Sequence, residues 1–205
     1  MLAASELECV RGERRLFAGL SFTLGAGHGL VVQGANGAGK TSLLRIVLGL
    51  SPPASGEVTW TGRPIRSLGE AYRRDLVYCG HSNALKDDLS AVENVRAAAA
   101  LSRGRITREE ARAALARAGV AAEADLPVRS LSQGQKRRTA LARLVPGGAR
   151  LWVLDEPLSA LDAGGVEWLA GMLDAHLERG GLALVTSHQA LPVRARLSTL
   201  HLGSR

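Results

Sequence analysis

Two hydrophobic patterns separate the first part of the chain from the rest. Partial alternation of apolar and polar residues between Leu7 and Leu24 predicts two short strands around a turn at Arg11–Glu13. Continuous apolar runs, typical of strands buried in a parallel sheet, follow at residues 29–33 and 151–156. The sequence therefore predicts a β flank beside a buried sheet, with strands at residues 29–33, 57–62, 76–80, 151–156, 181–186 and 198–202.

Helical patterns fill the middle of the chain. Three segments between residues 91 and 144 are rich in Ala, Leu, Arg and Glu and are separated by loop signals. Thr107 and Glu110 fit a capping box at the start of the second segment. Helices are predicted at residues 42–48, 91–101, 107–118, 132–144 and 166–177.

This order of elements indicates one α/β domain with a helical insertion. A chain of 205 residues is long enough for one large core and too short for two ordinary domains with a linker. We expect a single domain over residues 1–205, with a core of about 1–81 and 146–205 and a helical subdomain of about 82–145.

The composition is that of a globular protein. Hydrophobic residues make up 46% and charged residues 22%, and no apolar run reaches the roughly 18 residues that cross a bilayer. Acidic residues near the N-terminus, where a signal peptide has basic ones, argue against export. Cys9 and Cys79 lie far apart in the sequence and are expected to be buried free thiols.

The net charge of +7 is compatible with nucleic acid, an anionic membrane surface, or neither. Only 3% of the residues are aromatic, which weakens the case for a platform that stacks on bases. The arginines of the helical segment are expected on a solvated helix face. We therefore expect no nucleic-acid partner.

The segment Gly34–Thr41 fits the pattern of two glycines that bracket four residues and precede Lys and a hydroxyl residue. Between an expected strand and an expected helix, such a loop binds phosphates through backbone N–H groups and the helix N-terminus. We expect Lys40 to reach the β- and γ-phosphates and Thr41 to bind Mg²⁺. A turn that binds nothing is the alternative, but it would leave a buried Lys without an anion. The expected nucleotide-binding residues are Gly34, Asn36, Gly37, Ala38, Gly39, Lys40, Thr41 and Ser42.

Asp155 and Glu156 end an apolar strand at the carboxyl edge of the expected sheet, where open parallel sheets bind ligands. Phosphoryl transfer to water needs Mg²⁺ to offset charge and a carboxylate to orient or deprotonate the water. The alternative is that the two acids cap the N-terminus of a helix and occupy its first turn.

Together these segments resemble the ATP-binding subunit of ABC transporters, and the resemblance covers essentially the whole chain. Beyond the phosphate loop, residues 131–135 are similar to the LSGGQ signature of that family, residues 159–162 to its D-loop, and His188 to its switch histidine. The resemblance implies an α/β fold of the P-loop NTPase (RecA-like) class, with an antiparallel β flank and an inserted helical subdomain.

The resemblance also implies roles for individual residues and a partner. Asp155 matches the acid that supports Mg²⁺, Glu156 the general base, and His188 a contact of the γ-phosphate. Catalysis would then rest on Lys40 together with Glu156 and His188, and the cofactors would be ATP and Mg²⁺. Because the signature completes the site of an opposite subunit, a homodimer is expected, with its signature contacts from Ser132, Gly134 and Gln135.

The chain departs from the family pattern at three positions. Arg11 falls where the family has an aromatic residue that stacks on adenine, and a guanidinium can also stack on a π face. Gln133 replaces a glycine of the signature. His81 replaces a glutamine that touches Mg²⁺ and senses the membrane partner, although a simple loop histidine is the alternative.

Residues 80–94 and 131–144 resemble one branch of the family, the ATP-binding subunit of the cytochrome c maturation system, or haem exporter. This resemblance implies a peripheral protein on the cytoplasmic face of the bacterial inner membrane, bound to integral membrane permease subunits as part of a translocase. No direct haem binding is expected, because the chain has no CxxCH motif.

Two alternatives remain open. Another ABC exporter, for lipid or drug cargo, would carry the same motifs. ABC ATPases that act on nucleic acids carry long coiled-coil insertions, whereas only about 90 residues separate Lys40 from Ser132 here. The second alternative is therefore the weaker one.

Overall fold

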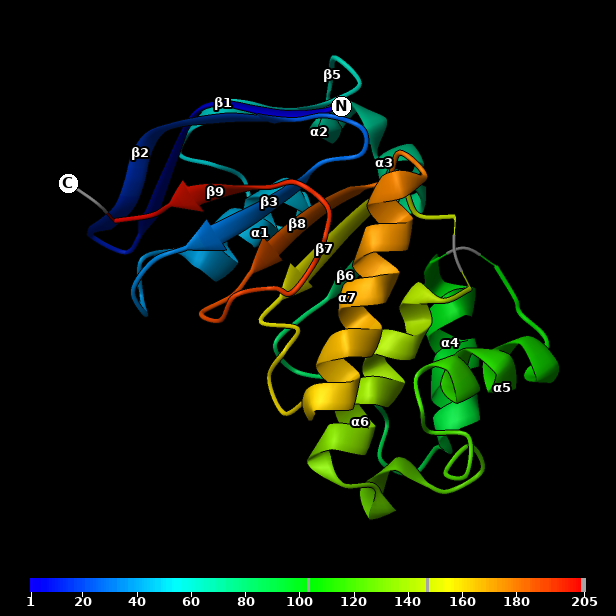
Figure 1. Ribbon diagram of the computed structural model, residues 1–205. Coiled ribbons are helices and arrows are strands. Elements are labelled where there is room, and N and C mark those ends of the chain that lie inside the picture. Colours follow the sequence, from blue (N-terminus) through cyan, green and yellow to red (C-terminus); the bar gives the residue numbers. More distant parts are fainter. Residues whose placement is uncertain (103, 147, 204–205) are drawn as a thin grey trace.

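The computed structural model describes residues 1–102, 104–146 and 148–203. Two sheets pack one over the other, and a group of helices lies to one side of them (Figure 1). The observed architecture confirms the expected α/β fold with an antiparallel β flank. In the described part of the chain, none of the helices has the length and apolar character needed to cross a membrane.

The first sheet is antiparallel, in the order β2-β1-β4-β5. The expected hairpin is present, but its first strand begins at Leu2 rather than at Leu7. A bulge around Glu6, whose φ is 48°, moves the buried side chains from even to odd positions and breaks the alternation before Leu7. The strands are β1 (Leu2–Arg11), β2 (Arg14–Leu24), β4 (Ser55–Trp60) and β5 (Arg63–Pro64).

The second sheet is parallel, in the order β6-β7-β8-β3-β9. Its central strands are buried on both faces, which explains their continuous apolar sequences. In β7, Leu151 and Val153 join the core beneath the antiparallel sheet, whereas Trp152 and Leu154 join the core beneath helix α7. The strands are β3 (Gly29–Gln33), β6 (Leu76–Cys79), β7 (Leu151–Asp155), β8 (Leu182–Thr186) and β9 (Leu197–His201).

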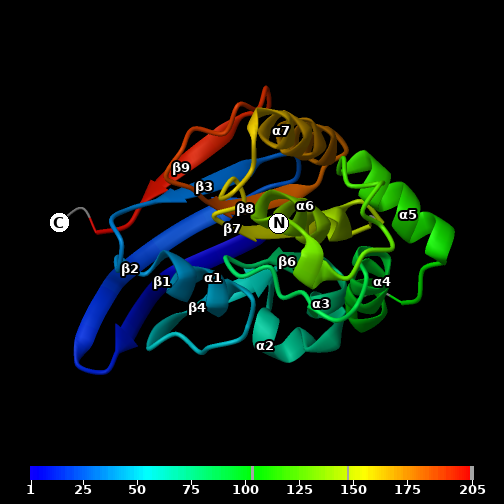
Figure 2. The ribbon, with the colours of Figure 1, turned by 90° about the horizontal axis from the view of Figure 1, so that it is seen from below.

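Helices cover both faces of the parallel sheet (Figures 1 and 2). Helix α1 (Lys40–Val47) packs between the two sheets and begins two residues before the expected start. Helix α7 (Ala163–Glu178) covers the other face, and it begins before the expected Val166 because the Asp162 side chain accepts a hydrogen bond from the Gly165 N–H. The short helices α2 (Ile65–Leu68) and α3 (Glu70–Arg74) were not expected, since single turns show no periodicity.

The helical segment has an apolar cluster of its own. This cluster is built from α4 (Ala91–Ser102), α5 (Arg108–Arg117) and the residues that lead to α6 (Gln133–Leu141). Two short 3₁₀ turns, Val128–Ser130 and Ala142–Leu144, flank α6. The expected capping box of Thr107 and Glu110 is present at the start of α5.

The expectation of a solvated arginine face is right for α5 and wrong for α6. The side chains of Arg108 and Arg112 are 52% and 45% exposed and pair with Asp125. Arg137 of α6, in contrast, is 2% exposed. The difference arises because α6 runs against the carboxyl ends of the parallel strands, where backbone carbonyl oxygens take the place of water as partners.

Candidate active site

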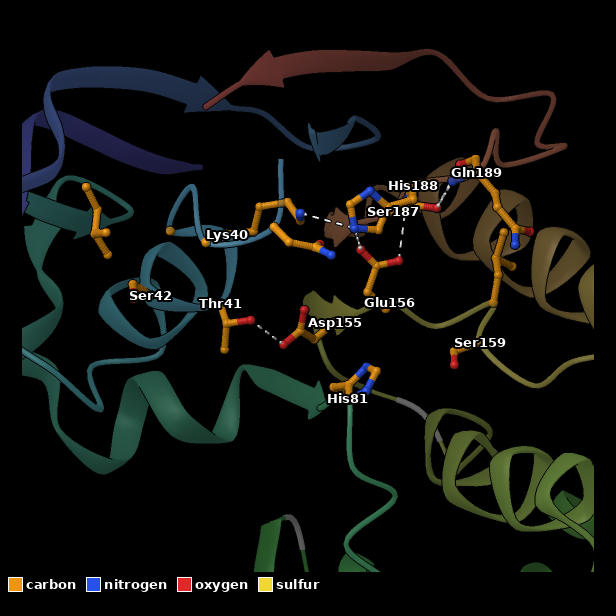
Figure 3. Close-up of a pocket in the computed structure, with 15 residues that line it drawn as sticks. Lys40, Thr41, Ser42, His81, Asp155, Glu156, Ser159, Ser187, His188 and Gln189 are labelled. Carbon is orange, nitrogen blue, oxygen red and sulfur yellow. Dashed lines mark hydrogen bonds and ion pairs between the residues drawn. The ribbon is translucent and has the colours of Figure 1, made fainter. Parts of the chain in front are cut away.

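The carboxyl ends of three adjacent parallel strands converge on one cavity. The loop after β3 leads into α1, β7 ends in Asp155, and β8 leads to Ser187 and His188. The cavity has a volume of about 610 Å³, and Figure 3 shows its labelled side chains gathered around one space. The residues expected in the site that line it are Asn36, Gly37, Gly39, Lys40, Thr41, Ser42, His81, Asp155, Glu156 and His188.

The backbone of the loop from Gly34 to Gly39 requires glycine at both of its ends. A Cβ atom at Gly34 would lie 2.6 Å from the Leu202 carbonyl oxygen, and Gly34 itself has φ of 154°. Gly39 is the left-handed N-cap of α1, with φ of 102°, and no side chain caps the helix there. The first N–H groups of α1 therefore remain available to an anion at the mouth of the cavity.

Lys40 is 9% exposed, and its own loop wraps around its ammonium group. The Lys40 Nζ donates hydrogen bonds to the carbonyl oxygens of Gly34 (2.7 Å) and Ala35 (3.3 Å). It also lies 3.2 Å from His188 Nε2 (Figure 3). Because the two carbonyl partners are neutral, a phosphate would supply the negative charge that this buried ammonium favours.

Asp155 is 3% exposed and is held by two hydroxyl groups. Thr41 Oγ1 donates to Asp155 Oδ2 (3.1 Å), and Thr186 Oγ1 donates to Asp155 Oδ1 (2.6 Å). The contact with Thr41 brings a hydroxyl and a carboxylate oxygen together beside the phosphate loop. Oxygen ligands of this kind suit Mg²⁺, so the donor set fits that ion.

Glu156 is held in an uncommon backbone conformation, with φ of 47°. A left-handed conformation of this kind costs on the order of 1–3 kcal/mol and persists only where the surroundings enforce it. The Glu156 N–H donates to Thr186 Oγ1 at 2.9 Å, which fixes one side of the residue. The turn directs the carboxylate into the cavity rather than along the strand (Figure 3).

The Glu156 carboxylate faces His188. Glu156 Oε1 lies 3.3 Å from His188 Nε2, and Oε2 accepts a hydrogen bond from the His188 N–H at 3.3 Å. Although close to the ring, the buried Oε1 has no partner with hydrogen-bond geometry among the described residues. Oε1 is therefore an acceptor with unused capacity beside His188.

The alternative that Asp155 and Glu156 cap a helix is wrong. Asp155 is the last residue of β7, and Glu156 begins an irregular turn. The N-cap of the next helix, α7, is Asp162. The Asp162 carboxylate accepts hydrogen bonds from the Arg138 guanidinium and the Gly165 amide, and these bonds hold the pKa of Asp162 below its ordinary value.

His81 and Arg11 have different positions relative to the cavity. His81, in the loop after β6, is exposed and lines the cavity near Asp155 (Figure 3). Arg11 does not line this cavity, and its guanidinium donates to Ser51 Oγ at 3.3 Å. Arg14 comes closer to the phosphate loop, with Nη1 4.0 Å from a Cβ atom built on Gly37.

The signature residues lie outside the cavity. Ser132 is the N-cap of α6, where it forms a capping box with Gln135. A Cβ atom on Gly134 would lie 3.2 Å from the Ala160 carbonyl oxygen, so the signature packs closely against residues 159–162. The structure therefore does not bring Ser132, Gly134 and Gln135 to the phosphate loop of the same chain.

Four residues that line the cavity, and one that supports it, carry no recognised signal in the sequence. Thr186 supports Asp155 and Glu156 from the neighbouring strand β8. Its only signal was its position at the end of a predicted strand beside His188. The unexpected lining residues are Leu16, Leu158, Ser187 and Gln189, whereas Ser159 belongs to residues 159–162, which resemble the D-loop.

Sequence comparisons with known proteins all point to one family. Residues 17–159 match the sequence profile of the ABC transporter family. The chain is 53% identical to the "Cytochrome c biogenesis ATP-binding export protein CcmA" of Dechloromonas aromatica, over 95% of this chain and 96% of that protein. It is 47% identical to the protein of the same name from Pseudomonas aeruginosa, over 100% of both chains.

Solved structures share the fold. A dimeric bacterial ABC transporter cassette superposes with a TM-score of 0.84 at 25% identity, over 98% of this chain and 94% of that one. An ATP-binding subunit of an ABC transporter gives a TM-score of 0.84 at 24% identity, over 98% of this chain and 85% of that one.

Proposed function

The chain belongs to the ABC transporter family, and from this premise we propose that it is the ATP-hydrolysing subunit of a membrane complex for cytochrome c biogenesis. The observation that carries the proposal is the convergence of Lys40, Asp155, Glu156 and His188 on one cavity. The names of the relatives supply the biological context of export in cytochrome c biogenesis. The cargo in this proposal is haem, or haem-loaded chaperone released on the far side of the membrane.

In this proposal the phosphate loop and Lys40 bind the phosphates of ATP. The N–H groups from Gly34 to Ser42 surround the phosphate oxygens, and the Lys40 ammonium exchanges its carbonyl partners for a charged one. Thr41 and Asp155 hold Mg²⁺, with His81 beside them. When bound, Mg²⁺ supplies positive charge that offsets the charge of the reacting phosphate.

Glu156 accepts the proton of the attacking water. The Glu156 carboxylate suits this role because the residue lines the cavity and its Oε1 has unused acceptor capacity. His188 lies between Glu156 and Lys40, within 3.3 Å of each, and contacts the γ-phosphate from there. Thr186 holds the Asp155 carboxylate through its hydroxyl group and fixes the backbone N–H of Glu156.

A second copy of the chain completes the site. Ser132, Gly134 and Gln135 lie at the N-terminal end of α6, outside the cavity of their own chain, and in this proposal that helix end meets the nucleotide of a partner. The likeness to a dimeric cassette supports this arrangement. Arg11 stacks on the adenine base in this proposal, and Arg14 lies beside Gly37 of the phosphate loop as a second cation.

The membrane partner docks beside β6. A groove of about 630 Å³ lies between this strand, the loop that follows it and α4. Leu50 and Leu101 line the groove and are 66% and 91% exposed, an apolar surface that a permease segment would cover. The protein would then be peripheral, on the cytoplasmic face of the inner membrane, with no nucleic-acid partner.

The test is to recover the tagged Glu156→Gln variant from native membranes in the presence of ATP and to identify bound proteins by mass spectrometry. Membrane proteins of cytochrome c maturation are expected, and they should be depleted in a Lys40→Ala control. A permease for lipids or drugs would overturn the haem-linked role and keep the ATPase. Nucleic acid or ribosomes without a membrane protein would contradict both.

A further inference from the structure

A buried guanidinium joins the end of β7 to the loop after β6. Arg137, on α6, is 2% exposed. Its Nε donates to the Pro157 carbonyl oxygen at 3.2 Å, and its Nη2 donates to the carbonyl oxygens of Asp155 (3.1 Å) and Glu156 (2.7 Å). Three successive carbonyl groups at the edge of the active site therefore share one partner.

The other end of the same guanidinium reaches the loop that carries His81. Nη1 donates to the Gly80 carbonyl oxygen at 2.9 Å and to Asn83 Oδ1 at 3.2 Å. Each of the five N–H groups of Arg137 thus has an acceptor, and all five acceptors are neutral oxygens. Burial lowers the pKa of Arg137, while the nearby carboxylates of Asp155 and Glu156 act in the opposite direction.

The contact with Glu156 falls on the residue whose backbone is strained. Glu156 has φ of 47°, and its N–H is fixed by Thr186 on one side. Arg137 fixes the carbonyl group on the other side, through the shortest of its five hydrogen bonds. Because the peptide groups on both sides of Glu156 are held, its left-handed conformation is maintained, and the direction of its carboxylate is maintained with it.

We infer that Arg137 is a positioning residue. It orients the Glu156 carboxylate toward the reacting water and couples this orientation to the position of the loop that contains His81. A displacement of residues 80–83 by a membrane partner would then reach Glu156 through the hydrogen bonds of a single side chain. The inference rests on the proposed ATPase function, because it concerns the geometry of the general base.

Arg143 provides a matched control from the same segment. Its guanidinium also donates to the loop, at the Asn83 carbonyl oxygen (2.8 Å), and to the Tyr78 carbonyl oxygen (3.4 Å). Its third acceptor is Ala140, within its own helical segment, so none of its hydrogen bonds to the described residues goes to Asp155, Glu156 or Pro157. Removing Arg143 therefore takes away one attachment of the loop, while Arg137 still holds the loop to the end of β7.

The experiment compares the full-length parent with Arg137→Gln, Arg137→Lys and Arg143→Gln. In steady-state ATP hydrolysis, Arg137→Gln should lower kcat by about tenfold or more while KM stays within about twofold, since the residue does not contact the nucleotide. Arg137→Lys should recover part of the loss, because an ammonium keeps the charge and three of the five donors. Arg143→Gln should keep kcat within about twofold of the parent.

Hydrogen exchange read by mass spectrometry supplies a second readout that does not depend on turnover. Arg137→Gln should speed exchange in residues 80–84 and 155–158 together, whereas Arg143→Gln should affect the first segment alone. If Arg137→Gln does not fold, Arg137→Lys decides the matter by the same two readouts.

Two results would overturn the inference. One is a kcat for Arg137→Gln equal to that of an active parent, and the other is unchanged exchange in residues 155–158. A parent chain that binds but never hydrolyses ATP would instead contradict the proposed function, and the exchange data would still decide whether Arg137 links the two segments.

Discussion

The α/β core and the helical segment carry their functional residues in different ways. In the core, Lys40, Asp155 and His188 come from segments far apart in the sequence and meet within one cavity. In the helical segment, Ser132 and Gln135 bond to each other across one helical turn. The core builds its part of the site by tertiary packing, whereas the signature is a local structure presented on a helix end.

This difference shows why one chain holds parts of two sites. The core cavity is lined by the Lys40 side chain, the carboxylates of Asp155 and Glu156 and the phosphate loop, but the signature lies outside it. If each region serves a different nucleotide, damage to the core and damage to the signature should complement each other in a mixed dimer. The predictions below separate the two regions, beginning with the largest effect on activity.

Glu156→Gln should lower kcat by about 10²–10⁴-fold, because the amide cannot accept the proton of the attacking water. Its affinity for ATP should stay close to that of the parent, since the phosphate loop is untouched. Turnover and nucleotide binding measured on the same preparation check both statements. Glu167→Gln, an exposed acid on α7, is the control and should hydrolyse ATP at the parental rate.

Ser132→Asn should lower kcat by at least about tenfold while the helix cap is kept, because Asn caps helices as well as Ser does. Mixing this variant with Lys40→Ala should give more activity than the mean of the two variants measured alone. The gain arises from dimers in which an intact phosphate loop faces an intact signature. A mixture that only averages the two activities would place both defects in the same site.

Leu115→Ala and Leu173→Ala compare the apolar clusters of the two regions. Both side chains are fully buried, Leu115 in the helical cluster and Leu173 on the face of α7 that packs against the parallel sheet, and each truncation should cost about 2–5 kcal/mol of unfolding free energy. If the helical segment is a separate subdomain, Leu115→Ala should speed hydrogen exchange within residues 91–144 more than elsewhere. Uniform acceleration across the chain would argue that the two regions unfold as one unit.

Thr107→Ala should have the smallest effect. It removes one half of the capping box at the start of α5 and should cost about 1 kcal/mol of unfolding free energy, with kcat unchanged. Urea unfolding measures the loss, and Thr107→Ser should restore most of it. A change in kcat would show that the helical segment affects the core more strongly than its packing indicates.

The parts of the fold with a simple sequence signal were predictable. The strand, glycine loop and helix around Lys40 follow from one apolar run, two glycines and a helical pattern. Asp155 and Glu156 were placed correctly at a strand end because the run before them is continuously apolar. The start of β1 was missed because the bulge at Glu6 shifts the alternation that reveals a strand.

Tertiary partners were not predictable from one sequence. Arg137 contacts Gly80, 57 positions away, and within its basic run it looked like part of a solvated face. The left-handed backbone of Glu156 also had no signal in the sequence, because this conformation depends on contacts with Thr186 and Arg137. The hydrogen bond from Arg11 to Ser51, 40 positions away, had no sequence signal either, and the role of Arg11 at the adenine base stays a prediction.

The most direct test of the account is the oligomeric state of Glu156→Gln with and without ATP, measured by light scattering after gel filtration. The account predicts a monomer without nucleotide and a dimer with ATP and Mg²⁺, and it predicts that Lys40→Ala in the same background stays monomeric. A Glu156→Gln chain that binds ATP to saturation and remains a monomer would contradict the claim that the two halves of the site meet across a dimer.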